Sequence, residues 1–172
     1  VDGTRAYDVL EFRRVLFRSI GNLRAARDLL RGLTPVGVPF EQAPIYQSEP
    51  VDCPDDAPDF YNTVIELDYV GEPAQLLEDT QAIEFHLGRQ ASAAPNAPRV
   101  IDIDILYFDQ LVIDAGLVVI PHPRMIHRRF VLQPLAEIRP QLTLPGDCVT
   151  ISEHLRHLDS GEPELTLVQA QW

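Results

Sequence analysis

Hydrophobic and polar positions repeat along the chain in two patterns, one typical of helices and one typical of strands. Apolar residues recur at intervals of three and four over residues 22–33 and 74–87, which predicts two amphipathic helices. Asn22 is suited to cap the first helix, and Pro73 is suited to the first turn of the second, which ends at Gly88.

Alternation with period two and β-branched residues predict strands elsewhere. The strands cover four ranges, the last as one strand or a pair: 36–46, 60–70, 100–108 and 111–120. Pro39 and Pro44 interrupt the first range, because proline cannot donate a hydrogen bond to a neighbouring strand.

Proline, small and polar residues predict long loops at 49–59 and 90–98. The later part of the chain is expected to hold three elements: an irregular basic turn at 121–129 and short helices at 130–138 and 151–158. Beyond these elements the pattern is poorly specified, and residues 161–172 are treated as a C-terminal tail.

The order of the predicted elements indicates the fold class. Helix, strand, strand, helix and strand follow one another from residue 20, and only an opening strand is missing from the split β-α-β-β-α-β arrangement. We therefore expect an α+β protein: a ferredoxin-like β-α-β-β-α-β sandwich with a mostly antiparallel sheet and extra C-terminal strands and helices. One domain over residues 20–160 suits a chain of 172 residues.

The missing strand falls in a segment with an unusual sequence. Residues 10–19 read Leu-Glu-Phe-Arg-Arg-Val-Leu-Phe-Arg-Ser and resemble a translated sequencing adapter. We therefore predict that residues 1–19 are non-native and that the fold begins after them. The alternative is a native amphipathic strand with arginines on one face. The stretch 9–17 has enough apolar and β-prone residues to fill part of the gap.

Charge and composition narrow the functional classes. The chain carries 26 acidic and 14 basic residues, a net charge of −12, which disfavours nucleic acids and membrane surfaces as partners. Every basic residue is arginine, which excludes a Walker-type phosphate loop and Schiff-base chemistry, because both need lysine. Cys53 and Cys148 form neither a zinc-ligand spacing nor a disulfide framework, so a cytoplasmic location is expected.

Asp102 and Asp104 are the sharpest chemical feature, in the run Arg99-Val-Ile-Asp-Ile-Asp-Ile-Leu. Residues two apart in a strand point to the same face, so both carboxylates leave the sheet side by side. A pair of hard oxygen ligands suits Mg²⁺, which takes its other ligands from water and phosphate oxygens. The alternative is an amphipathic strand whose polar face meets water.

Arginine is concentrated around this aspartate pair. Five of the ten arginines outside residues 1–19 lie between positions 89 and 129: Arg89, Arg99, Arg124, Arg128 and Arg129. Guanidinium groups bind phosphate oxygens bidentately, so the cluster favours a polyphosphate ligand, although any single arginine is better explained as a solvated surface charge. His122, between two prolines, is either a further phosphate donor or a structural histidine.

The run Pro58-Asp-Phe-Tyr-Asn62 after the first long loop offers a different chemistry. Phe60 supplies an aromatic face and Asn62 an amide, which together suit a flat heterocycle. Phe130 is a candidate for the opposite face of such a slot. Taken apart from the other motifs, both phenylalanines are better explained as core residues.

Three motifs together resemble those of the 6-hydroxymethyl-7,8-dihydropterin pyrophosphokinase family of folate biosynthesis. They follow in order as Pro58-Asp-Phe-Tyr-Asn62, Pro98-Arg-Val-Ile-Asp-Ile-Asp-Ile-Leu106 and Ile120-Pro-His-Pro-Arg-Met125, and the resemblance spans about residues 20–145. It implies a ferredoxin-like fold and the transfer of diphosphate from ATP to the hydroxymethyl group of the pterin, with release of AMP.

The resemblance also implies which residues bind the two substrates. The expected catalytic residues are Arg89 and Arg99, which face the transferring diphosphate, and Asp102 and Asp104, which hold two Mg²⁺ ions on ATP. The expected ATP-binding residues are Gln81, Glu84, Ile105, His122 and Arg128. The expected pterin-binding residues are Ser48, Val51, Phe60, Asn62 and Phe130. The expected partners are thus two small molecules, and the protein is expected to be a monomer.

The chain departs from the family pattern at three places. Ser19-Ile-Gly-Asn22 stands where the family has a Gly-Ser-Asn turn after its first strand. Ala91 stands where a second loop arginine is frequent, and Asn96 where a tryptophan is frequent. These departures predict weaker binding of ATP.

Two other functional classes stay open on the residues alone. One is a different Mg²⁺-dependent phosphotransferase or phosphohydrolase, which would use the aspartate pair but need no aromatic slot. The other is a non-catalytic ligand-binding domain of ferredoxin-like type, which would not need the arginine cluster.

Overall fold

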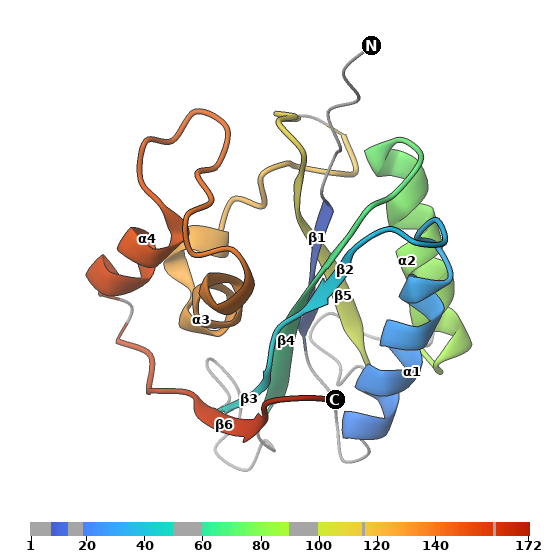
Figure 1. Ribbon diagram of the computed structural model, residues 1–172, viewed down its shortest axis with the longest axis horizontal. Coiled ribbons are helices and arrows are strands. Elements are labelled where there is room, and N and C mark those ends of the chain that lie inside the picture. The colour runs from blue at the N-terminus through green and yellow to red at the C-terminus, as the bar shows by residue number, and fades with distance from the viewer. Residues whose placement is uncertain (1–7, 14–18, 50–59, 90–99, 115, 160) are drawn as a thin grey trace.

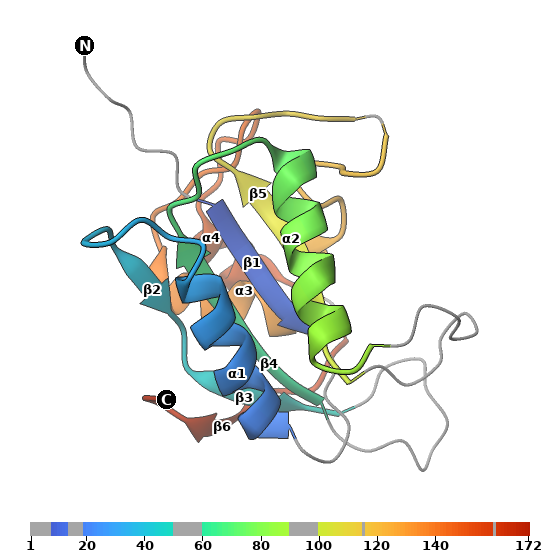
Figure 2. The ribbon, with the colours of Figure 1, turned by 90° about the vertical axis from the view of Figure 1, so that its right-hand side faces the viewer.

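The computed structural model describes residues 8–13, 19–49, 60–89, 100–114, 116–159 and 161–172. They form three layers, a central sheet with helices on both of its faces (Figure 1). Helices α1 (Ser19–Arg31) and α2 (Pro73–His86) cover one face of the sheet. Helix α3 (Arg129–Ile138) lies on the other face, with α4 (Ile151–His157) beside it (Figures 1 and 2). The predicted α+β class is confirmed.

Every strand pair in the described part of the sheet is antiparallel. The strands are β1 (Asp8–Arg13), β2 (Phe40–Gln42), β3 (Ile45–Ser48), β4 (Phe60–Leu67), β5 (Asp102–Phe108) and β6 (Thr166–Gln169). Their order is β5-β1-β4-β3-β6, and β2 pairs with the second half of β4. Strands β5 and β6 therefore lie at opposite edges.

Strand β1 occupies the interior of the sheet, between β4 and β5. Leu10 is fully buried and stands opposite Ile65 on one side and Ile105 on the other. The expectation that the fold begins after residue 19 is therefore wrong for Asp8–Arg13. Without a strand in this position, the backbone groups of β4 and β5 that face it would lose their hydrogen-bond partners. The non-native origin of residues 1–19 stays a prediction.

Two of the predicted strands differ from the structure. The range 36–46 contains two short strands, β2 and the start of β3, and Pro44 separates them because it has no amide hydrogen to donate. The described residues of the range 111–120 form a loop with one isolated bridge, in which Ile113 and Ile120 exchange backbone hydrogen bonds. Ile120 is buried in the core and Ile113 packs against it, whereas Val112 and Leu117 are exposed, so only part of this range has the packing that would hold a longer strand.

The helices predicted for the two halves of the chain are confirmed, although α1 begins at Ser19 rather than Asn22. Strand β6, in contrast, lies in the range treated as a C-terminal tail. Its first two residues are exposed and its last two are half-buried, so the alternation that marks a half-buried strand is missing. Among the described residues, no helix is long and apolar enough to cross a bilayer.

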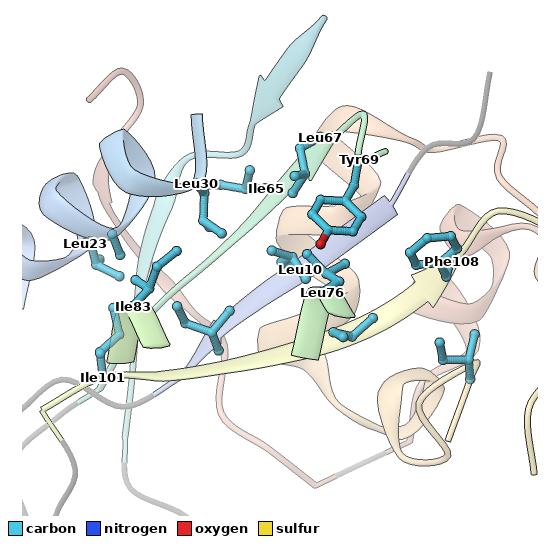
Figure 3. Close-up of a cluster of buried hydrophobic side chains, with 14 of the residues drawn as sticks. Leu10, Leu23, Leu30, Ile65, Leu67, Tyr69, Leu76, Ile83, Ile101 and Phe108 are labelled. Carbon is cyan, nitrogen blue, oxygen red and sulfur yellow. The ribbon is translucent and has the colours of Figure 1, made fainter. Parts of the chain in front are cut away.

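Two hydrophobic clusters lie on the two faces of the sheet. Between the sheet and helices α1 and α2, buried side chains interdigitate from both layers (Figure 3): Leu10, Leu23, Leu30, Ile65, Leu67, Leu76 and Ile83. On the opposite face, Val64 and Leu106 belong to the cluster that includes Val131 and Leu135 of α3. Alternation along β4 and β5 thus divides their residues between the two clusters.

Candidate active site

The two aspartates of β5 share the sheet face on which α3 lies. Ile103 and Ile105 pack in the cluster beneath α1 and α2, so Asp102 and Asp104 point to the opposite face. Both aspartates are half-buried. The strand therefore presents two carboxylates side by side, as their spacing predicts.

Glu84 and Arg89 connect the end of α2 to this pair. Only 1% of Glu84 is exposed, and one of its oxygens accepts a hydrogen bond from the backbone nitrogen of Ile103 at 2.7 Å. The other oxygen is ion-paired with Arg89, whose guanidinium also lies 3.5 Å from Oδ1 of Asp102. Because a guanidinium offers five N–H donors, Arg89 has the capacity to hold these carboxylates and an anionic ligand together.

Burial raises the pKa of the Glu84 carboxyl group to about 7. Removal from water disfavours the carboxylate, and the charge of Asp102 adds to the rise. The hydrogen bond from Ile103 and the charge of Arg89 favour the ionised form and limit the rise of the pKa. The Glu84 carboxyl group is therefore close to half-protonated near neutral pH, where it contacts the backbone of β5 at Ile103.

The basic turn predicted at 121–129 is irregular, as expected, and contains a short 3₁₀ helix, η1 (Met125–His127). The backbone nitrogen of His122 donates to the carbonyl of Leu106 at 2.7 Å, which fixes the turn to β5. Nδ1 of His122 accepts from the backbone nitrogen of Arg124 at 3.2 Å, so in the neutral ring Nε2 carries the proton. Arg128 is buried, and its guanidinium carbon lies 5.4 Å from the ring centre of Phe130.

The candidate heterocycle site is built where β3, β4 and α3 meet. Nδ2 of the buried Asn62 donates to Oγ of Ser48 at 2.8 Å, and Ser48 stands opposite Phe60 in the strand register. Phe130 lies in the first turn of α3, buried in the cluster on this face of the sheet. The hydroxyl of Tyr46 donates to Glu137 at 3.0 Å and ties β3 to α3.

The other predicted site residues lie on α2, on β5 or outside the described residues. Gln81 is exposed on α2. The side chain of Ile105 is buried beneath α1 and α2, so any contact with a nucleotide would come from its backbone. Val51 and Arg99 lie outside the described residues, so their roles stay predictions.

The donor set on β5 fits a metal ion that arrives with its ligand. Among the residues that the structure describes, no group of three or more His, Cys, Asp or Glu side chains is arranged to hold a metal by itself. Mg²⁺ bound to a nucleotide takes most of its ligands from phosphates and water and needs only one or two protein carboxylates. Asp102 and Asp104 match that requirement.

A buried ion pair on the same sheet face was not anticipated from the sequence. Glu66, 2% exposed, binds both Nε and an Nη of Arg139, and accepts a hydrogen bond from the Tyr107 hydroxyl at 3.2 Å. The pair joins β4 to the end of α3 and is a structural contact. Its only signal in the sequence is a glutamate within an apolar strand.

Solved structures share this fold. An HPPK-DHPS crystallised in complex with substrates superposes with a TM-score of 0.67 over 88% of this chain and 43% of that chain, at 13% identity. The Plasmodium falciparum wild-type HPPK-DHPS with pteroate gives a TM-score of 0.67 over 89% of this chain and 42% of that chain, at 14% identity. At such low identity, the likeness shows the fold alone.

Sequence relatives identify the family. The chain is 44% identical over 98 residues to 2-amino-4-hydroxy-6-hydroxymethyldihydropteridine pyrophosphokinase of Bacillus subtilis, covering 57% of this chain and 58% of that enzyme. It is 42% identical over 103 residues to the enzyme of the same name from Pseudomonas aeruginosa, covering 60% and 62%. The chain thus spans about three-fifths of the length of these relatives. Residues 16–140 match the sequence model of 7,8-dihydro-6-hydroxymethylpterin-pyrophosphokinase (HPPK), and the chain therefore belongs to the HPPK family.

Proposed function

We propose that this protein transfers diphosphate from ATP to the hydroxymethyl group of 6-hydroxymethyl-7,8-dihydropterin, giving AMP and the pterin diphosphate of folate biosynthesis. One observation carries the proposal: a single sheet face presents the two carboxylates of β5 and the Asn62–Ser48 pair, and Phe130 of α3 is buried on that face. A phosphate-binding half and a heterocycle-binding half on one surface suit a reaction that joins a polyphosphate to a flat ring.

We also infer a ferredoxin-like arrangement. Strand β1 lies between β4 and β5, and β4 lies between β1 and β3, which is the order that two interleaved β-α-β units produce. Helices α1 and α2 cover the same face, as two such crossovers require. The domain of residues 20–160 stays a proposal, and β1 and β6, which lie outside those bounds, pair with its sheet.

Asp102 and Asp104 are the residues that would hold two Mg²⁺ ions carried on the ATP phosphates. When bound, such ions supply charge neutralisation and orientation of the transferring phosphate groups. Arg89 lies against Asp102, so its guanidinium is placed to bind a phosphate next to the metal ligands. Glu84 keeps Arg89 in that place and fixes the backbone of β5 between the two aspartates.

Two further side chains, those of His122 and Arg128, are assigned to the other end of the polyphosphate. His122 has Nε2–H as its donor in the neutral ring, and Arg128 brings a buried guanidinium to the same sheet face as the aspartates. We propose that both bind ATP phosphates and that Gln81, Glu84 and Ile105 border the nucleotide. Arg99 is proposed to face the transferring diphosphate together with Arg89.

The pterin is assigned to the β3–β4–α3 half. Phe60 and Phe130 are proposed to stack on its two faces, because flat aromatic pairs gain from stacking as well as from burial. Asn62, held by Ser48, is proposed to read the edge of the ring, and Val51 to border it. The Arg128 guanidinium near the Phe130 ring places positive charge at the boundary between the two halves.

The protein needs no covalent nucleophile for this reaction. The hydroxyl oxygen of the pterin forms a bond to the β-phosphorus, the bond from that phosphorus to the AMP oxygen breaks, and the hydroxyl proton passes to water. Transfer of phosphoryl-type groups is mainly a matter of positioning and charge stabilisation, which the named side chains provide. We expect the enzyme to act as a cytoplasmic monomer.

A magnesium-dependent assay for AMP release tests the proposal. AMP is expected only when ATP, Mg²⁺ and the pterin are all present. Nucleotide breakdown that does not require the pterin would favour a different Mg²⁺-dependent phosphotransferase or phosphohydrolase. Pterin or nucleotide binding without any AMP would favour a non-catalytic ligand-binding domain.

A further inference from the structure

Residues 161–172, named here the C-terminal segment, contact both walls of the proposed pterin site. Within this segment β6 pairs with β3, where Leu167 stands opposite Tyr46 and Thr166 opposite Gln47. Oε2 of Glu162 accepts a hydrogen bond from the backbone nitrogen of Arg129 at 2.8 Å, in the first turn of α3. Strand β3 carries Ser48 and α3 carries Phe130, so one segment holds both elements.

Trp172 anchors the far end of this segment. Its indole nitrogen donates to the carbonyl of Ala43 at 2.8 Å, and its own carbonyl accepts from the side chain of Gln42. The Ala43 carbonyl also accepts from the hydroxyl of Thr63 at 2.9 Å, so Trp172 joins a contact between β4 and the chain just before β3. The guanidinium carbon of Arg27 lies 5.2 Å from the indole ring centre and ties the same residue to α1.

We propose that the C-terminal segment positions the pterin-binding walls, with Trp172 and Glu162 as its positioning residues. The inference rests on the proposed function. Strand β3 would otherwise be the sheet edge, and edge strands lose their neighbour's hydrogen bonds and move more easily. The catalytic aspartates lie on β5, at the opposite edge from β6, with three strands between them. Loss of the Trp172 anchor should therefore affect pterin binding and spare ATP binding.

Steady-state kinetics on the full chain test the inference. Trp172→Ala is expected to raise KM for the pterin by about 5- to 20-fold, the range of one lost buried hydrogen bond with its packing, and to leave KM for ATP within about twofold. Trp172→Phe keeps an aromatic ring but loses the indole donor, so a smaller rise of about two- to threefold is expected. Gln171→Ala, at the exposed neighbouring position, is the matched control and should behave as the unmodified chain.

Glu162→Ala provides an independent test at the other end of the segment, should Trp172→Ala fail to fold. It should raise KM for the pterin and speed hydrogen exchange at the amide of Arg129, while Glu164→Ala, at an exposed position two residues on, should do neither. Lower thermal stability with both KM values unchanged would overturn the inference, because a purely structural contact reduces only the amount of folded enzyme. Equal rises in both KM values for Trp172→Ala would overturn it too. If the unmodified chain releases no AMP and binds no pterin, the proposed function fails first and this inference with it.

Discussion

The two halves of the proposed site are held together by different forces. The phosphate half, Glu84, Arg89, Asp102 and Asp104, depends on charges that meet within a short stretch of sequence. The pterin half, Ser48, Asn62, Phe60 and Phe130, depends on packing and on one neutral hydrogen bond, between Asn62 and Ser48. In the proposed function, Mg²⁺ ions carried on ATP would complete the first half, since they would bring positive charge to the two aspartates. The second half should be shaped in advance, because a flat ring that stacks between side chains gains little from a site that is not already closed around it.

The largest effect is expected from the phosphate half. Asp102→Ala or Asp104→Ala should lower AMP release by about 100-fold or more, because each would remove a proposed ligand of the Mg²⁺ that stabilises the transferring group. The protein without ligand should lose little thermal stability, since the change also relieves repulsion between the two carboxylates. Asp114→Ala, at an exposed position after β5, is the control and should stay active. Near-normal Mg²⁺-dependent activity in either variant would contradict the metal assignment.

The pterin half should respond to a change in packing and not in charge. Phe130→Ala should weaken pterin binding by about 10- to 100-fold, since a stacked and buried ring contributes about 1–3 kcal/mol. ATP binding should weaken much less, and calorimetric titration with each ligand measures the difference. Phe85→Ala, on the exposed side of α2, is the control. Equal losses for both ligands, or a loss confined to thermal stability, would make Phe130 only a core residue.

The same contrast explains what the sequence predicts well. Asp102 and Asp104 are two residues apart in a strand, so their shared face follows from strand geometry alone. The contacts of Ser48 with Asn62 and of Glu162 with Arg129 do not follow from spacing along one element, and only the fold brings these residues together. Strand β6 could not be predicted, because it pairs with one neighbouring strand and its residues do not alternate between buried and exposed.

Strand β1 is the element shared by both halves, since it lies between β4 and β5. We predict that replacing residues 1–20 with a strand that ends in Gly-Ser-Asn raises AMP release by about tenfold, because small displacements of reacting groups have effects of that order or more. Glycine at this turn lets the backbone approach the site, which a bulky residue prevents. A second chimera with the same strand but an Ala-Ala-Ala ending separates repair of the strand from repair of the turn. If the original chain equals the first chimera in stability and in AMP release, residues 1–19 are a working native strand.

An effect on stability and not on turnover, a dependence on pH, is again expected from the phosphate half. The pKa of Glu84 is about 7 in the folded protein against an ordinary value of 4.5, so between these values the folded state binds more protons than the unfolded state. The free energy of unfolding should therefore fall as pH rises through this window, and the contribution of Glu84 is complete only below about pH 4.5. Glu84→Gln is neutral at every pH, so it should match the unmodified chain at about pH 5 and exceed its stability at about pH 8 by on the order of 1–3 kcal/mol. Urea unfolding across this pH range, without Mg²⁺ or ATP, measures the difference, and Glu78→Gln at an exposed position of α2 is the control. A difference that does not change with pH would show that Glu84 is not the group that titrates.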